Sequence, residues 1–63
     1  MLSENDRVIA LVEKEGFPKG SVGVIVSKYA LAEVYEVELW DSMNYPVDVV
    51  AYKTEELQRV EAK

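Results

Sequence analysis

The chain has 63 residues, enough for one small domain that spans 1–63. It contains neither cysteine nor histidine, which excludes disulfides, the usual zinc ligands and the commonest catalytic base. Twelve acidic residues against seven basic ones give a formal net charge of −5. Such a charge repels phosphate polymers and anionic membranes but attracts basic proteins. Composition therefore favours a protein partner, and neither nucleic acid nor a membrane is expected.

The N-terminal residues lack the basic start and the unbroken apolar core of a signal peptide. No apolar run approaches the length that spans a bilayer. We therefore expect a cytoplasmic protein.

The first predicted strand covers residues 6–12, which are rich in β-branched side chains, and a loop with glycine, proline and charge follows at 13–21. A helix over 6–15 is the competing interpretation, because Ala10, Leu11 and the glutamates favour one. A strand is preferred, since the apolar run has the length of a typical strand and stops before Gly16.

The second predicted strand, 22–29, has four apolar β-branched residues among its first five. Residues 30–33 form either one helical turn or a loop. In the third predicted strand, 34–40, Tyr35, Val37 and Leu39 alternate with two glutamates. That period of two predicts one buried and one solvated face, with Tyr35 on the buried face.

A turn is predicted at 41–46, and the alternation resumes in a strand over 47–53 through Val47, Val49 and Ala51. Residues 54–57 have the composition of a short helical turn, with Thr54 as a capping residue. A terminal strand follows at 58–62. Five short strands with one helical turn before the last predict an all-β fold, a small partly open barrel.

Gly20 and Gly23 raise the question of a phosphate-gripping loop. Such loops place several backbone N–H groups at a helix N-terminus, whereas a β-branched strand follows here. The pattern instead predicts a positive φ at Gly20 in a turn, and a bulge or a close backbone crossing at Gly23.

Several short motifs resemble the SH3-like barrel group that includes the KOW module, and are closer still to a family of very short bacterial proteins of unknown function. The residues that carry the resemblance are Asp6 with Val8, Lys19-Gly20, Gly23 with Val24-Ile25, Tyr35-Glu36-Val37 and Glu56-Leu57. The resemblance implies a five-stranded SH3-like barrel. It also implies a companion of a larger protein, in some cases of a secreted toxin. Unlike KOW modules with basic loops, this chain is acidic, which argues against RNA binding.

The acidic pairs do not form a catalytic or metal site. Glu36 and Glu38 share the solvated face of one strand, and Glu55 and Glu56 are adjacent. Alternating acids on a wet face serve solubility, and no calcium-loop pattern occurs. We expect no catalytic residue, no bound metal and no cofactor.

The predicted binding surface rests on a surplus of aromatic and aliphatic side chains. Trp40 and Tyr45 lie among acids, the composition of an interface anchor, although Trp40 covering an open barrel end is the alternative. The strands 6–12 and 22–28 are apolar on both faces, which indicates contact with another chain unless a bulge at Gly23 absorbs the surplus. The predicted partner-binding residues are Ile9, Leu11, Glu36, Glu38, Trp40, Asp41 and Tyr45.

The leading hypothesis is therefore a non-enzymatic protein-binding module, an immunity- or antitoxin-like partner that neutralises a larger basic protein. A homo-oligomer is the other way to cover the apolar surface. The alternative function is a KOW-like accessory of the translation or transcription machinery. That alternative requires the four basic residues Arg7, Lys14, Lys19 and Lys28 to gather on one face.

Overall fold

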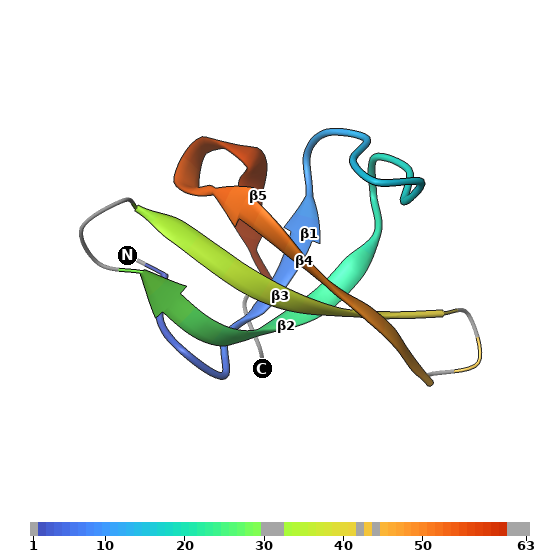
Figure 1. Cartoon of the computed structure of the whole chain (residues 1–63), viewed down its shortest axis with the longest axis horizontal. Coiled ribbons are helices and arrows are strands. Elements are labelled where there is room, and N and C mark those ends of the chain that lie inside the picture. Colours follow the sequence, from blue (N-terminus) through green and yellow to red (C-terminus); the bar gives the residue numbers. More distant parts are fainter. Residues whose placement is uncertain (1, 30–32, 42, 44, 61–63) are drawn as a thin grey trace.

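The computed structural model describes residues 2–29, 33–41, 43 and 45–60. Five strands and one three-residue 3-10 turn follow one another along the chain (Figure 1). Their bounds are β1 Arg7–Ala10, β2 Val22–Tyr29, β3 Val34–Trp40, β4 Pro46–Lys53, η1 Thr54–Glu56 and β5 Leu57–Arg59.

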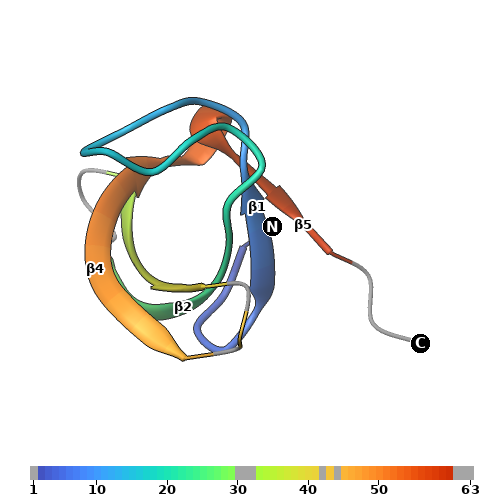
Figure 2. The ribbon, with the colours of Figure 1, turned by 90° about the vertical axis from the view of Figure 1, so that its right-hand side faces the viewer.

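All strand pairs are antiparallel, in the order β4-β3-β2-β1-β5. The sheet curls around one interior without closing, because β4 and β5 remain its two edges (Figure 2). The expected all-β architecture, a partly open five-stranded arrangement with a helical turn before the last strand, is confirmed.

Several strand boundaries differ from the prediction. The strand expected over 6–12 covers Arg7–Ala10, and the carbonyl of Ala10 accepts from Gly20 N–H in the turn before β2. The fourth strand begins one residue early, at Pro46, and the strand expected over 58–62 covers Leu57–Arg59. The predicted turn or loop at 30–33 lies mostly outside the described residues.

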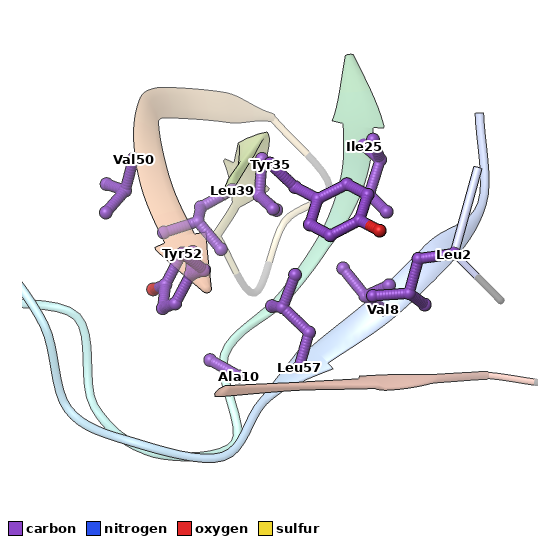
Figure 3. Close-up of a cluster of buried hydrophobic side chains, with 10 residues drawn as sticks. Leu2, Val8, Ala10, Ile25, Tyr35, Leu39, Val50, Tyr52 and Leu57 are labelled. Atoms are coloured by element: carbon purple, nitrogen blue, oxygen red, sulfur yellow. The ribbon is translucent and has the colours of Figure 1, made fainter. Parts of the chain in front are cut away.

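One face of the curled sheet forms the hydrophobic core (Figure 3). Tyr35 is buried in it, as its position in the alternation predicts, and the half-buried Phe17 packs against it. Burying aliphatic and aromatic side chains of this size is the main stabilising contribution in so small a protein. The buried residues are Leu2, Val8, Ala10, Ile25, Tyr35, Val37, Leu39, Val50, Tyr52 and Leu57.

The predicted burial of β4 is wrong. The alternation through Val47, Val49 and Ala51 points outward, and the buried residues of β4 are Val50 and Tyr52. The register explains this, because Val50 pairs with Val37 and Tyr52 with Tyr35, both of them interior residues. Asp48 shares their parity but lies near the exposed start of the strand.

Gly23 is the point where β2 and β3 come closest. A Cβ at this position would lie 2.5 Å from the carbonyl oxygen of Glu38 and 2.7 Å from Cγ1 of Val37. The predicted close crossing is confirmed, while the bulge falls later in β2, between Ile25 and Ser27. Gly20 has φ +96°, the positive value expected in the turn.

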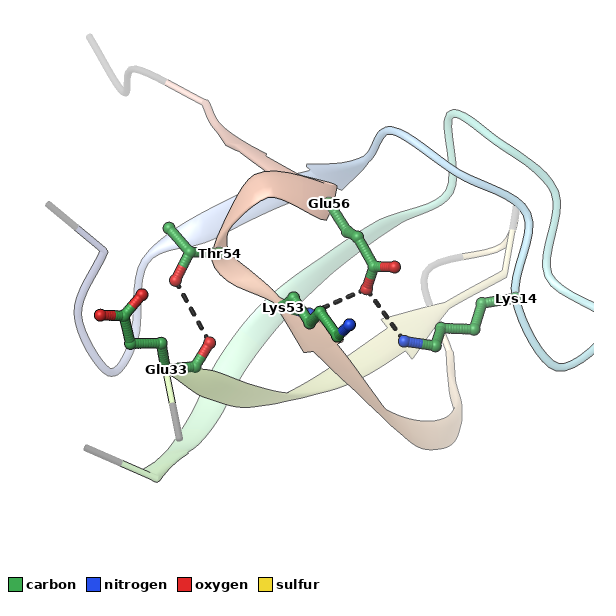
Figure 4. Close-up of polar contacts among 5 residues, drawn as sticks. All are labelled: Lys14, Glu33, Lys53, Thr54 and Glu56. Atoms are coloured by element: carbon green, nitrogen blue, oxygen red, sulfur yellow. Dashed lines mark hydrogen bonds and ion pairs between the residues drawn. The ribbon is translucent and has the colours of Figure 1, made fainter. Parts of the chain in front are cut away.

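A polar cluster ties the loop before β2 to the end of β4 (Figure 4). The carboxylate of Glu56 accepts from Lys14 Nζ at 2.9 Å and from the backbone N–H of Lys53 at 2.8 Å. The ammonium group of Lys14 also lies 5.3 Å from the ring centroid of Tyr52. Thr54 does not cap the turn, because its hydroxyl donates to the carbonyl of Glu33 instead. The cluster therefore braces the open side of the curled sheet.

We predict that Gly23→Ala destabilises the protein far more than Gly20→Ala. The added methyl group at Gly23 meets backbone, so the strands must separate, at a cost of about 3 kcal/mol or more. At Gly20 no atom lies within 4 Å, so only the unfavourable φ remains, worth about 1 kcal/mol. Urea unfolding followed by circular dichroism compares the two variants. Equal destabilisation would contradict the steric role of Gly23.

We predict that Glu56 makes stability fall in acid. The hydrogen bond from Lys53 N–H, and then Lys14, lower the pKa of Glu56 below its ordinary 4.5. The unfolded chain therefore takes up the proton first, and the stabilisation is lost as pH falls from about 4.5 through the lower folded-state pKa. Glu56→Gln should lower the free energy of unfolding at pH 7 by about 1 kcal/mol and flatten this acid dependence.

The matched control is Glu55→Gln, which removes a neighbouring exposed carboxylate. It should leave the acid dependence of the unfolding free energy as in the unmodified chain. If both variants flatten that dependence equally, general charge, and not the contacts of Glu56, controls it.

Candidate protein-binding face

The strand register places a row of side chains across the outside of the sheet. Arg7 pairs with Val24, Val24 with Glu38, and Glu38 with Val49. Successive residues of a strand point to opposite faces, and the interior residues flank this row on every strand. We call the convex side formed by β1 to β4 the outer face.

A second row of the outer face is largely apolar. On β1 and β2 Ile9 pairs with Val22, and on β3 and β4 Trp40 pairs with Pro46. Trp40 is 38% exposed, and Val47 and Val49 are 53% and 47% exposed. Trp40 thus lies on the outer face of β3 and is not a member of the hydrophobic core. The apolar surplus predicted from the sequence is present on the surface.

Two carboxylates of the outer face accept hydrogen bonds from aromatic neighbours. Trp40 Nε1 donates to Glu38 Oε1 at 3.2 Å. Tyr29 donates to Glu36, and this hydrogen bond together with the negative charge of Glu36 raises the pKa of Tyr29 above its ordinary value. Because these contacts reduce rotamer freedom before any partner arrives, the acids and rings are held in place for binding.

Asp41 organises the turn between β3 and β4. Its Oδ1 accepts from the backbone N–H of Met43 at 2.9 Å and of Tyr45 at 3.0 Å. Its own N–H donates to the carbonyl of Tyr45 at 2.9 Å. This is the local side-chain bonding typical of aspartate in turns. The Tyr45 side chain is exposed beside it, so Asp41 positions Tyr45 at the end of the hairpin.

The outer face has two hollows. A cleft of about 590 Å³ lies beside Trp40, and its other main lining residues are Arg7, Val22, Val24 and Asp41. A shallower depression of about 210 Å³ lies over β3 and β4. Its lining residues are Glu38, Pro46, Val47, Asp48 and Val49.

Two N–H groups on the free edge of β4 are already occupied by carboxylates of the same chain. Val49 N–H donates to Oδ1 of Asp48 at 2.8 Å, and Lys53 N–H donates to Glu56. In an antiparallel ladder alternate residues direct their N–H groups away from the neighbouring strand, so these two are edge groups already occupied by carboxylates. These contacts disfavour the addition of a further strand at this edge.

The structure brings together most of the predicted binding residues. Glu36, Glu38 and Trp40 share the outer face, and Ile9 joins it through its pairing with Val22. Asp41 and Tyr45 extend the face into the hairpin turn.

Leu11 lies beyond the end of β1, where its N–H donates to the carbonyl of Glu56, and it is not among the residues that line the cleft beside Trp40. Sequence reasoning missed several outer-face residues. The sequence pattern predicts that Val47 and Val49 are buried, so they are not among the predicted binding residues. Only the pairing of β4 with β3 shows which face of the sheet they are on. The missed residues are Arg7, Val22, Val24, Tyr29, Val47 and Val49.

Within the described part of the chain, no cluster of three or more acidic side chains has a geometry that holds a metal ion. Among the same residues, no helix has the length and apolar character needed to cross a bilayer.

Comparison with known proteins finds no matching family model, no matching curated protein and no matching solved structure. The resemblance to SH3-like barrels and to short bacterial companions of larger proteins therefore stays a prediction.

We predict that adjacent residues of β3 have opposite roles in stability. Leu39→Ala empties a buried site and should lower the free energy of unfolding by about 3 kcal/mol. Trp40→Ala removes an outer-face ring and should cost no more than about 1.5 kcal/mol. Urea unfolding followed by circular dichroism measures both. A larger loss for Trp40→Ala would show that Trp40 supports the fold and is not reserved for binding.

Proposed function

We propose that this protein is a non-enzymatic protein-binding module whose outer face docks onto a basic partner protein. The observation that carries the proposal is the set of exposed apolar side chains that β1 to β4 place on the outer face, among them Val22, Trp40 and Val49, with carboxylates beside them. Exposed apolar surface of this kind on a small protein marks an interaction site. A half-exposed tryptophan next to a cleft is a typical binding anchor.

Charge selects the kind of partner. Glu36 and Glu38 lie on the outer face and Asp48 lines the depression beside it, while Arg7 and Lys53 are cations that the register places on the same face. The net charge of −5 attracts a positively charged surface, which speeds encounter and disfavours acidic partners. A second copy of this chain carries the same charge and is repelled. The occupant of the face is therefore a different protein.

Neutralisation of that partner is the specific role we propose, as the resemblance to companions of secreted toxins implies. An immunity- or antitoxin-like protein needs a stable surface and no reaction chemistry. The described residues provide such a surface, with acids and rings held by the hydrogen bonds of Glu36 and Glu38. Binding of this kind blocks a partner by covering its surface.

The basic residues do not favour the alternative, a KOW-like RNA-binding accessory. Lys14 is engaged by Glu56 on the open side of the sheet, and Arg7 lies in the cleft that Asp41 also lines. RNA binding requires several cations that face the phosphates together. RNA capture is therefore an outcome of the test that would contradict the proposal.

We predict that immobilised protein retains one basic protein from a lysate of the native cells, and that Trp40→Ala weakens this binding at least tenfold. Loss of a central anchor costs 2 kcal/mol or more, which is the physical reason for the expected change. Leu11→Ala is the matched control, because Leu11 has nearly the same exposure, 37% against 38%, but lies beyond the end of β1 and does not line the cleft beside Trp40. Mass spectrometry identifies the retained protein, and calorimetry with the purified pair measures the affinities.

Equal loss in both variants, or in neither, would contradict docking at the outer face. Retention that disappears after ribonuclease treatment would favour the RNA-binding alternative. Self-association that Trp40→Ala abolishes, measured by sedimentation, would assign the face to a second copy of the chain.

A further inference from the structure

The depression over β3 and β4 combines an apolar floor with two carboxylates. Pro46, Val47 and Val49 supply its apolar side chains, and Glu38 and Asp48 supply its negative charge. Glu38 and Val49 are direct cross-strand partners, so the acid and the apolar group lie within a few ångströms of each other. The lining contains no lysine or arginine among the described residues. Nothing within the described chain neutralises the pair.

We propose that this depression binds an arginine side chain of the basic partner. The inference rests on the proposed function and deepens it, since it names the chemical group that the outer face recognises. Arginine carries a long apolar stem below a charged head, and such side chains bury the stem while the head stays near water or acid. The valine floor fits the stem. Glu38 on the outer face and Asp48, whose carboxylate lies at the strand edge against Val49 N–H, both line the depression and offer the guanidinium group negative charge.

Each carboxylate keeps one oxygen free of hydrogen bonds within the described chain. Glu38 uses Oε1 to accept from Trp40, and Asp48 uses Oδ1 to accept from Val49 N–H. Oε2 of Glu38 and Oδ2 of Asp48 therefore remain available. A guanidinium group is planar and offers several N–H donors in a fixed fork, so it can join two acceptors. The single ammonium group of lysine lacks this geometry, which is why arginine is preferred.

The same contacts disfavour the simplest competing occupant, a strand added at the β4 edge. A new strand would use Val49 N–H as a donor, and it would first have to displace Asp48. Approach over the face of β3 and β4 meets no such competition, and there a projecting side chain reaches the depression.

The test uses the full-length ¹⁵N-labelled protein and a small probe, an acetylated and amidated arginine–leucine–arginine peptide. Titration followed by NMR should shift the amide signals of residues 47–49 in a saturable manner. The control probe is the same peptide with citrulline in place of arginine, which keeps the shape and removes the charge. It should produce no saturable shift at these amides.

Two variants remove the charges one at a time. Asp48→Asn keeps a side-chain oxygen that can accept from Val49 N–H, and Glu38→Gln keeps one for Trp40. Each should weaken peptide binding at least about threefold. Glu55→Gln removes the same unit of charge from an exposed site outside the depression and should leave the affinity unchanged. Circular dichroism confirms that each variant is folded.

Equal weakening by Glu55→Gln would show general attraction to an acidic protein and overturn the proposal, as would equal shifts with the citrulline peptide. Failure of the two proposals is distinguishable. Partner binding that needs Trp40 but tolerates Asp48→Asn and Glu38→Gln would reject the arginine site and keep the docking face. Saturable peptide binding without a captured partner would keep the site and reject the proposed function.

Discussion

The close approach of β2 to β3 at Gly23 is the constraint on which the rest of the molecule depends. Any side chain there would meet the backbone of Glu38, so only glycine lets the sheet bend tightly enough to enclose an interior. Ten residues share that interior, and they come almost entirely from one face of the strands. The tight curl therefore has a second result, because it turns the valines and Trp40 of the opposite face toward the outside.

In the proposed function, the outer face would combine two kinds of interaction that serve different steps of recognition. Long-range charge from Glu36, Glu38 and Asp48 would act during approach, and desolvation of Trp40 and the valines would stabilise the complex after contact. Hydrogen bonds link the aromatic side chains to the acids, because Trp40 donates to Glu38 and Tyr29 donates to Glu36. A partner therefore meets acids whose positions are already restricted, which lowers the entropy lost on binding.

Local pattern predicts much of this protein from sequence. Alternation in β3 gave the correct faces for Tyr35, Val37, Glu36, Glu38 and Trp40, and glycine chemistry located the turn and the crossing. Alternation failed in β4, because valines occupy both faces there and only pairing with β3 decides which is buried. The contact of Lys14 with Glu56 joins residues 42 positions apart. Such long-range contacts, and the depression beside Asp48, depend on the folded register and have no local signal.

The occupied N–H groups along β4 bear on how the protein behaves at high concentration. An eight-residue border strand rich in valine is the usual template on which further molecules polymerise into cross-β fibrils. Here carboxylates of the same chain already fill two of its outward donor positions. A newcomer would have to displace negatively charged acceptors before it could extend the ladder. These two contacts therefore disfavour fibril growth along β4 although its valines are exposed.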